Sequence, residues 1–270
     1  MLRKNCMNPW DSGKPAFLKT ACWKCGSAAD GQATGGTEGP KILAHVEGHD
    51  RYSHLQNLTP QIGQVLSDAG ITVDDLSAIA AANGPGSFTG IRIGVSTARA
   101  LSQVKGIPCV PVSSLEALAM RASSTDDAKA GALICPILDA RRSQVYGGGY
   151  VFENPGDGAV LKEVVKAGPY TIDEFMGAVK DFSRVFMMGD GVDTCGEKIK
   201  EIRSDGVAFA PEQIRYQRAE EVAILGAAKF IAGGGVTFES LEPEYMRMAE
   251  AERKLRAKQA AEKSGEKANG

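Results

Sequence analysis

The residues best suited to chemistry lie in one glycine-rich stretch, residues 83–94, which follows a short apolar run and leads into a helical pattern. Its glycines and a proline form a tight turn that most side chains could not follow. Ser87 and Thr89 can cap the helix that starts there. A helix N-terminus offers free backbone N–H groups and the positive end of a dipole, which suits a phosphate. The residues that could contact it are Gly84, Gly86, Ser87, Phe88, Thr89, Gly90 and Arg92.

The same turn could also be a rigid strand-to-helix corner that binds nothing, and both interpretations stay open. Gly84, Gly86 and Gly90 are spaced G-x-G-x-x-x-G, which is too long for the dinucleotide-binding pattern. No Lys-Ser or Lys-Thr follows, so the turn is not a P-loop. The stretch therefore matches none of the common nucleotide motifs.

Two further groups of residues raise the question of a metal. Cys22 and Cys25 form a C-x-x-C, but the chain has no second such pair to complete a zinc site. The three histidines, His45, His49 and His54, lie close together in sequence, but their spacing is not that of a zincin helix. We therefore expect no metal site and no catalytic constellation.

The elements that position the turn are strands alternating with helices in two successive sets, residues 16–112 and 113–248. This alternation predicts an α/β protein of two lobes with mixed sheets. Residues 1–15 read as an irregular extension, and residues 249–270 as a charged tail without apolar periodicity. The sequence does not say whether the strands before residue 40 fold normally.

The composition limits the classes of function. The chain of 270 residues has 31 basic and 33 acidic residues and a net charge of −2. It therefore has no strong basic field that would hold nucleic acid without help. No apolar run approaches the length of a membrane span, and no signal-peptide h-region is visible. Six cysteines in a chain this long do not make a disulfide scaffold, so we expect a cytoplasmic protein.

The run GPGSFTGIRIG at 84–94, followed by a helical pattern and by VSSLEALA at 112–119, closely resembles the TsaB (YeaZ) family. Proteins of that family serve bacterial tRNA threonylcarbamoyladenosine biosynthesis. Two later segments also match the family: DARRSQVY at 139–146 and PEYMR at 243–247. The resemblance covers most of residues 41–248 and implies the two-lobed actin-like ATPase (ASKHA, ribonuclease-H-like) fold.

The resemblance also implies a role. Such proteins bind TsaD, the catalytic subunit that transfers threonylcarbamoyl to the adenosine beside the anticodon, and the ATPase TsaE joins them. The tRNA would be contacted only through the complex. The family places an aspartate in a turn where this chain has Lys19, within residues 18–21, and this departure argues against phosphate chemistry. No cofactor is expected, except that ATP or ADP at the partner interface stays open.

Two other functions remain alternatives to a non-catalytic subunit. One is a self-sufficient enzyme of the actin-like superfamily, a kinase or a glycoprotease-like metallopeptidase. The other is a homodimeric scaffold. Asp139, Arg141 and Arg142 could likewise hold an anion or simply form a salt bridge within a hairpin.

The helix at 88–105 is apolar over more than half of its circumference, which predicts burial on two sides. One side would face its own lobe, and the other a second helix of the chain or a partner protein. Since the family docks through this region, we expect helices 54–69 and 88–105 to bind TsaD, with Ala98 at an edge where backbones approach closely. The partner-facing residues expected are His54, Leu58, Ile62, Val65, Gly94, Ala98 and Leu101.

Overall fold

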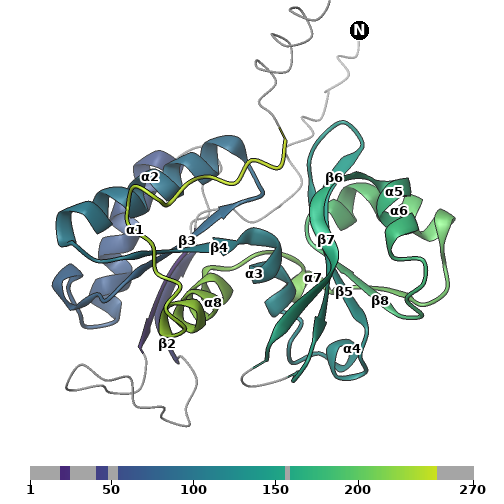
Figure 1. Cartoon of the computed structure of the whole chain (residues 1–270), viewed down its shortest axis with the longest axis horizontal. Coiled ribbons are helices and arrows are strands. Elements are labelled where there is room, and N and C mark those ends of the chain that lie inside the picture. The colour runs from purple at the N-terminus through teal and green to yellow at the C-terminus, as the bar shows by residue number, and fades with distance from the viewer. Residues whose placement is uncertain (1–18, 25–40, 48–53, 156–158, 248–270) are drawn as a thin grey trace, which may run out of the picture.

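The computed structural model describes residues 19–24, 41–47, 54–155 and 159–247, and these form two lobes (Figure 1). The expected extension at 1–15 and the tail at 249–270 lie outside the described residues. The two lobes and their mixed sheets confirm the predicted fold class.

The second lobe is built on one mixed sheet of five strands in the order β7-β6-β5-β8-β9. Its central strand β5 pairs antiparallel with β6 and parallel with β8. Apolar side chains alternate between the two faces of β5, because successive residues of a strand point to opposite sides. Helices α5 and α6 cover one face, and α3 and α4 lie on the other (Figure 1). The strands are β5 (Leu133–Asp139), β6 (Gln144–Phe152), β7 (Leu161–Thr171), β8 (Val185–Met188) and β9 (Val207–Phe209).

The helices of this lobe begin at identifiable caps. Thr171 and Glu174 form a capping box at α5, in which each side chain satisfies the other residue's backbone N–H. Ser113 and Thr125 each accept a hydrogen bond from the backbone of the helix that follows. Thr125 thereby starts the short helix α4. The helices are α3 (Ser114–Met120), α4 (Asp126–Lys129), α5 (Ile172–Ala178), α6 (Gly191–Ile202) and α7 (Glu212–Arg215).

The first lobe has smaller sheets. Among its described strands, β1 (Lys19–Lys24) pairs antiparallel with β2 (Lys41–Glu47), and β3 (Ile79–Gly84) pairs parallel with β4 (Cys109–Ser113). The sequence predicted a turn at residues 18–21, and this prediction is wrong for its described part. Residues 19–21 instead pair with β2 as part of a continuous strand, so Lys19 does not occupy a phosphate-binding turn.

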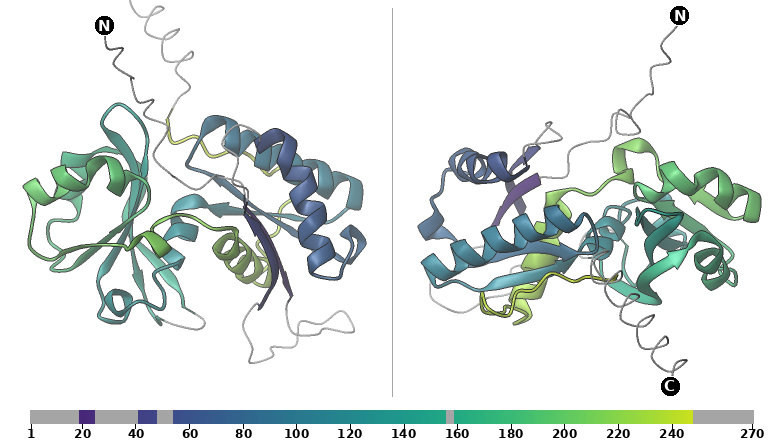
Figure 2. Two further views of the ribbon diagram at one scale, coloured as in Figure 1. Left: turned by 180° about the vertical axis from the view of Figure 1, so that it is seen from behind. Right: turned by 90° about the horizontal axis from the view of Figure 1, so that it is seen from above.

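Helix α2 (Phe88–Lys105) connects β3 to β4, and α1 (His54–Asp68) lies beside it on the outer side of the lobe (Figure 2). Thr72 forms a capping box with Asp75 at the 3₁₀ turn η1 (Val73–Asp75). Gly106 ends α2 in the left-handed conformation, which a glycine adopts without strain. The two helices predicted for this lobe are therefore confirmed.

Helix α8 (Ala219–Ile231) follows the second lobe in sequence but packs against the strands of the first. A Cβ atom at Gly226 would lie 2.3 Å from that of Ala80, so only glycine permits this close approach. The chain then runs past β4, where Val236 and Cys109 exchange backbone hydrogen bonds of 2.8 and 2.9 Å. Helix α8 and the segment from Val236 to Leu241 therefore complete the first lobe from a distance in sequence, while the lobe boundary at 112/113 stays a prediction.

None of the helices in the described part of the chain is long and apolar enough to cross a membrane.

Candidate functional site

The glycine turn is a corner between β3 and α2. Gly84 has φ +137°, which side-chain-bearing residues rarely adopt, and its peptide bond to Pro85 is cis. Ser87 is the N-cap of α2: its Oγ accepts a hydrogen bond from the backbone N–H of Gly90 at 3.4 Å. The N–H of Ile91 donates to the Ser87 carbonyl at 2.9 Å. The chain thus satisfies part of the helix N-terminus with its own groups.

Residues 241–247, which we call the C-terminal strap, cover this corner. The backbone N–H of Glu244 donates to the Asn83 carbonyl at 2.7 Å, and the Asn83 side-chain amide donates to the Glu242 carbonyl at 3.3 Å. A Cβ atom at Gly84 would lie 2.4 Å from the Glu244 carbonyl oxygen. Leu241 is fully buried in the core beneath α2. A glycine is therefore needed at position 84 for two reasons: its φ is positive, and a side chain there would collide with the backbone of the strap.

Aromatic and guanidinium groups continue this contact on the outside. The rings of Phe88 and Tyr245 stack with their centroids 4.7 Å apart. The Arg92 guanidinium lies 3.9 Å from the centre of the Phe88 ring, and its Nε donates to the Tyr245 hydroxyl at 2.8 Å. These contacts support the structural interpretation of the turn, since the strap lies directly against it. Phosphate binding there stays a prediction.

The strap also reaches the second lobe. The Arg247 guanidinium donates to the Ala140 carbonyl at 2.7 Å, in the turn between β5 and β6. The next three residues, Arg141, Arg142 and Ser143, have φ of 64°, 57° and 58°. The left-handed conformation costs about 1–2 kcal/mol per residue when side chains are present. Residues 241–247 thus connect the glycine turn of one lobe to a strained turn of the other.

Two aspartate carboxylates hold the strained turn by accepting hydrogen bonds from its backbone. The Asp139 carboxylate accepts from the backbone N–H of Arg141 at 2.8 Å, and the Asp190 carboxylate accepts from that of Asp139 at 2.9 Å. The Arg141 guanidinium lies 3.9 Å from the Asp139 carboxylate. This contact agrees with the hairpin salt bridge that the sequence offered as one of two interpretations.

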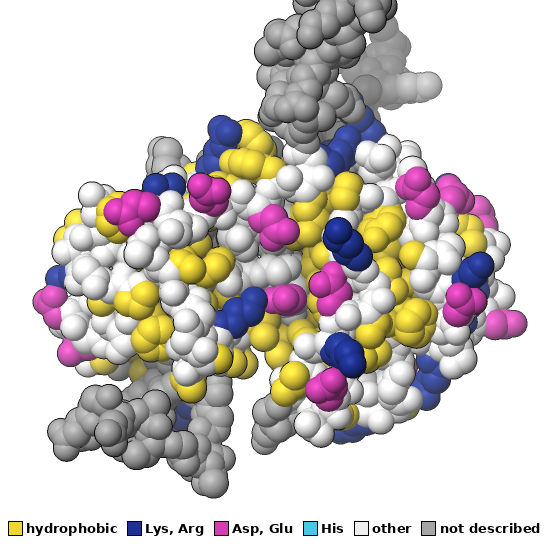
Figure 3. Space-filling model, viewed as in Figure 1, with side chains coloured by type: hydrophobic (Ala, Val, Ile, Leu, Met, Phe, Trp, Pro, Cys, Tyr) yellow, Lys and Arg dark blue, Asp and Glu magenta, His cyan; other side chains and the backbone are white. Residues whose placement is uncertain are grey.

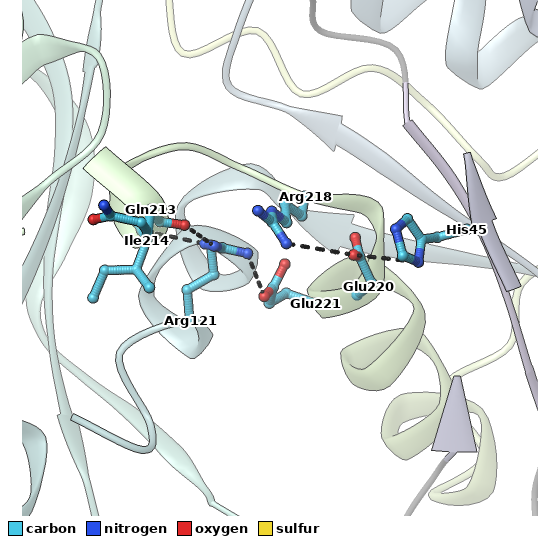
Figure 4. A network of polar contacts seen from close by, with 7 residues as sticks. All are labelled: His45, Arg121, Gln213, Ile214, Arg218, Glu220 and Glu221. Carbon is cyan, nitrogen blue, oxygen red and sulfur yellow. Dashed lines mark hydrogen bonds and ion pairs between the residues drawn. The ribbon is translucent and has the colours of Figure 1, made fainter. Parts of the chain in front are cut away.

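A second polar site lies between the lobes, deeper in the molecule (Figure 4). Arg121, at the end of α3, is 6% exposed and donates to Glu221 Oε1 of α8 at 2.8 Å. It also donates to the carbonyls of Ile214 and Gln213 at 3.2 and 2.7 Å. Burial raises the pKa of the Glu221 carboxyl above its ordinary value, while the positive charge of Arg121 opposes that change. Sequence reasoning missed this pair, whose members lie a hundred residues apart in the chain.

The neighbouring carboxylate, Glu220, lies 3.9 Å from both Arg218 and His45 (Figure 4). His45 is thus placed on β2 facing α8, while His49 lies outside the described residues. Within the described part of the chain, no group of three or more His, Cys, Asp or Glu side chains could hold a metal ion. Burial raises the pKa of the Cys135 thiol, which therefore stays protonated and is a poor nucleophile.

The residues expected to face a partner divide into two sets. Leu58, Val65 and Ala98 are 8%, 2% and 4% exposed and belong to the interior of this lobe. The expectation that Ala98 lies at an open edge is wrong, because its side chain packs with Val95 and Leu241 beneath the helix. Ile62, Gly94 and Leu101 are half-buried, and the side chain of His54 lies outside the described residues.

The outer face of α2 instead presents small and apolar residues that the sequence did not single out. Ser96 and Ala100 are exposed one turn apart, and Val104 follows with 79% of its surface exposed. Cβ atoms added at Gly63 of α1 or Gly94 of α2 would have no neighbour within 4 Å. Ser96 and Ala100 lie about half a turn around the helix from Ala98, and only this phase could have identified the outer face from sequence.

Comparison with known proteins assigns the family. Residues 42–255 match the family model described as "TsaD: tRNA N6-adenosine threonylcarbamoyltransferase". A Bacillus subtilis protein named "tRNA threonylcarbamoyladenosine biosynthesis protein TsaB" is 33% identical over 79% of this chain and 88% of its own length. Its Escherichia coli namesake is 29% identical over 81% of this chain and 90% of its own.

Solved structures agree with the sequence relatives. The solved structure titled "YeaZ from Pseudomonas aeruginosa" matches with a TM-score of 0.58 at 26% identity, over 76% of this chain and 89% of that one. A second structure, described as an uncharacterized protein similar to YeaZ, matches with a TM-score of 0.60 and covers 77% of this chain and 90% of its own. The chain has the actin-like ATPase fold and belongs to the TsaB (YeaZ) family of tRNA threonylcarbamoyladenosine biosynthesis proteins.

Proposed function

We propose that this chain is a non-catalytic subunit that binds a TsaD-type transferase and supports threonylcarbamoyl transfer to tRNA. The observation that carries the proposal is the similarity to proteins named TsaB over about nine-tenths of their own length. The match of residues 42–255 to the transferase family model supports the proposal, since it makes this chain similar to TsaD itself. This similarity also favours a complex in which one lobe of this chain packs against one lobe of TsaD.

The outer face of α1 and α2 is the surface we assign to the transferase. It combines exposed Ser96, Ala100 and Val104 with open space at Gly63 and Gly94. Small residues allow two helices to approach closely, and an exposed valine loses contact with water when covered. A standard protein interface buries about 1,600 Å² in total. The TsaE ATPase and the tRNA would join through the complex, and ATP or ADP would bind, if at all, at the boundary between the subunits.

The transferase family match favours a second candidate, in which this chain catalyses the transfer itself. One observation on the chain weighs against it. The polar groups around the glycine turn, such as Ser87 and Arg92, are engaged in contacts within the chain. A homodimeric scaffold would use the same outer face of α2 for a second copy.

Reconstitution distinguishes these functions. We expect the purified chain alone to show neither threonylcarbamoyl transfer to a tRNA transcript nor appreciable ATP hydrolysis. We expect transfer to appear when a TsaD-type transferase and TsaE are added, and to fall when this chain is left out. Turnover by the chain alone would establish the enzyme instead. A dimer that gives no gain in transfer with the other subunits would establish the scaffold.

A further inference from the structure

The outer surface of the strap carries exposed aromatic rings beside a guanidinium. Tyr245 is 42% exposed and Phe88 is 39% exposed, although their rings stack on each other. Arg92 lies over the Phe88 ring and bonds to the Tyr245 hydroxyl. These contacts fix the rings and the guanidinium in place before any partner arrives, which lowers the entropy that binding would cost.

Two residues further along the strap, Arg247 bonds to the Ala140 carbonyl of the β5–β6 turn. The turn itself presents Arg141, whose side chain is 62% exposed, and the exposed Arg142. The three successive left-handed residues at 141–143 are held there by the hydrogen bond from the Arg141 N–H to Asp139. Strained turns of this kind gather at functional sites.

These side chains form one surface across both lobes, which we call the aromatic–arginine face. In the space-filling view, apolar and dark blue side chains lie together over the N-terminal end of α2, and further dark blue side chains lie over the tip of the β5–β6 turn (Figure 3). The face consists of Phe88, Arg92, Arg141, Arg142, Tyr245 and Arg247.

We propose that the aromatic–arginine face binds an unpaired loop of RNA, and that this subunit therefore contacts the tRNA directly. Exposed aromatic rings stack on unpaired bases, and arginines contact the backbone phosphates, which together is the chemistry of single-stranded nucleic acid recognition. Asp139 of the β5–β6 turn and Glu242 and Glu244 of the strap are acidic residues beside this face, and the whole chain carries a net charge of −2. Binding therefore depends on this local arrangement and is weak for the chain alone. The choice of RNA rests on the proposed function.

The test uses fluorescence anisotropy of the full chain with a labelled RNA hairpin that has an open loop, and with a blunt duplex of the same stem. We expect the parent to prefer the hairpin. Tyr245→Ala should weaken hairpin binding about tenfold, because a stacking ring is lost. Tyr245→Phe keeps the ring and should bind like the parent. The double variant Arg141→Ala/Arg142→Ala should lower the slope of log K against log salt by about 1.4, the value for two phosphate contacts to a single strand.

Arg184→Ala is the matched control, since this arginine is 53% exposed and pairs with Asp127 away from the face. It should leave hairpin binding unchanged. The proposal is overturned if the parent binds no hairpin, if it binds the duplex equally well, if the face variants bind like the control, or if an acidic peptide displaces the hairpin. Co-elution of every variant with a TsaD-type transferase is measured in parallel. Loss of RNA binding with retained co-elution supports the face, whereas loss of co-elution in the parent would contradict the proposed function instead.

Discussion

The hydrophobic cores of the two lobes are built from different parts of the chain. The second lobe buries both faces of one five-stranded sheet under helices that are local in sequence, α3 to α6. The described strands of the first lobe form two small sheets, whose core is completed by α8 and the strap from the far end of the chain. The second lobe is thus a self-contained scaffold. The first lobe depends on returning segments, and it carries the helices that we assign to the partner.

The largest effect is expected in the core of the second lobe. Phe175 is fully buried, and its ring fills the space left by Gly147, where a Cβ atom would lie 2.8 Å from the ring. Phe175→Ala should lower the free energy of unfolding by about 3–5 kcal/mol, since it leaves a large cavity. Urea denaturation followed by circular dichroism measures this loss. A change below about 1 kcal/mol would mean that the core relaxes around the cavity, against the scaffold assignment.

The next effect concerns the buried pair that joins the lobes. Arg121→Ala leaves Glu221 without its partner in a site where the two side chains are 6% and 13% exposed. Removal of one member of a buried pair costs about 3–5 kcal/mol, because the remaining charge is left buried without its partner. The double variant Arg121→Met/Glu221→Leu should recover most of the loss. If the single variant is as stable as the parent, the pair does not join the lobes.

A smaller and more local effect is expected at the strap. Leu241 is fully buried beneath α2, and Leu241→Ala should cost about 2–3 kcal/mol. Hydrogen exchange should speed up in residues 83–92 and leave β5 to β8 protected, because the strap packs on the first lobe. Equal loss of protection in both lobes would show that they unfold as one unit and would remove the contrast between them.

The smallest effect is a dependence on pH. Burial raises the pKa of Glu221 above its ordinary value of 4.5, so the folded protein keeps this proton where the unfolded chain has lost it. The contribution of Glu221 to stability is therefore lost as the pH rises from about 4.5 through the raised pKa. Glu221→Gln has no such titration, so its stability relative to the parent should improve with pH over that range. Thermal melts from pH 4 upward test this, and a constant difference would contradict it.

Glu174 supplies the contrast within the second lobe. Its hydrogen bonds from Thr171 lower its pKa, so its contribution is present at neutral pH and is lost as the pH falls through the lowered pKa. The parent should therefore be more stable than Glu174→Gln at neutral pH, and this difference should disappear in acid. The trend with pH is opposite in sign to that of Glu221→Gln. The cap and the buried pair can be told apart by this sign alone.

Local patterns were enough to predict most of this fold. The helix expected at 54–69 is α1, and the glycine turn with its capping serine predicted the start of α2 at Phe88. The placement of α8 could not be read in this way, because nothing in its own sequence says which lobe lies against Gly226. Ala98 was misplaced for a related reason: an apolar helix surface does not reveal which side the strap will cover.

The candidate site shows the same limit. Sequence reasoning identified the glycine turn and the turn at Asp139 separately. The strap that connects them depends on Tyr245 and Arg247, which contact residues more than a hundred positions away. Such long-range pairs leave no periodic signal in a single sequence. The signal that was available, the aromatic and basic residues of PEYMR, indicated the family but not the contact.

The most direct test of the central claim is the Kd of the complex with a TsaD-type transferase, measured by isothermal titration. Ala100→Glu would place an unpaired carboxylate in the proposed helix interface without disturbing the core, since Ala100 is exposed. A buried unpaired charge costs about 3–5 kcal/mol, so the Kd should rise by about two to three and a half decades. Val160→Glu changes a half-exposed residue of the second lobe in the same way and should leave the Kd unchanged. A folded Ala100→Glu variant that binds as tightly as the parent would contradict the account.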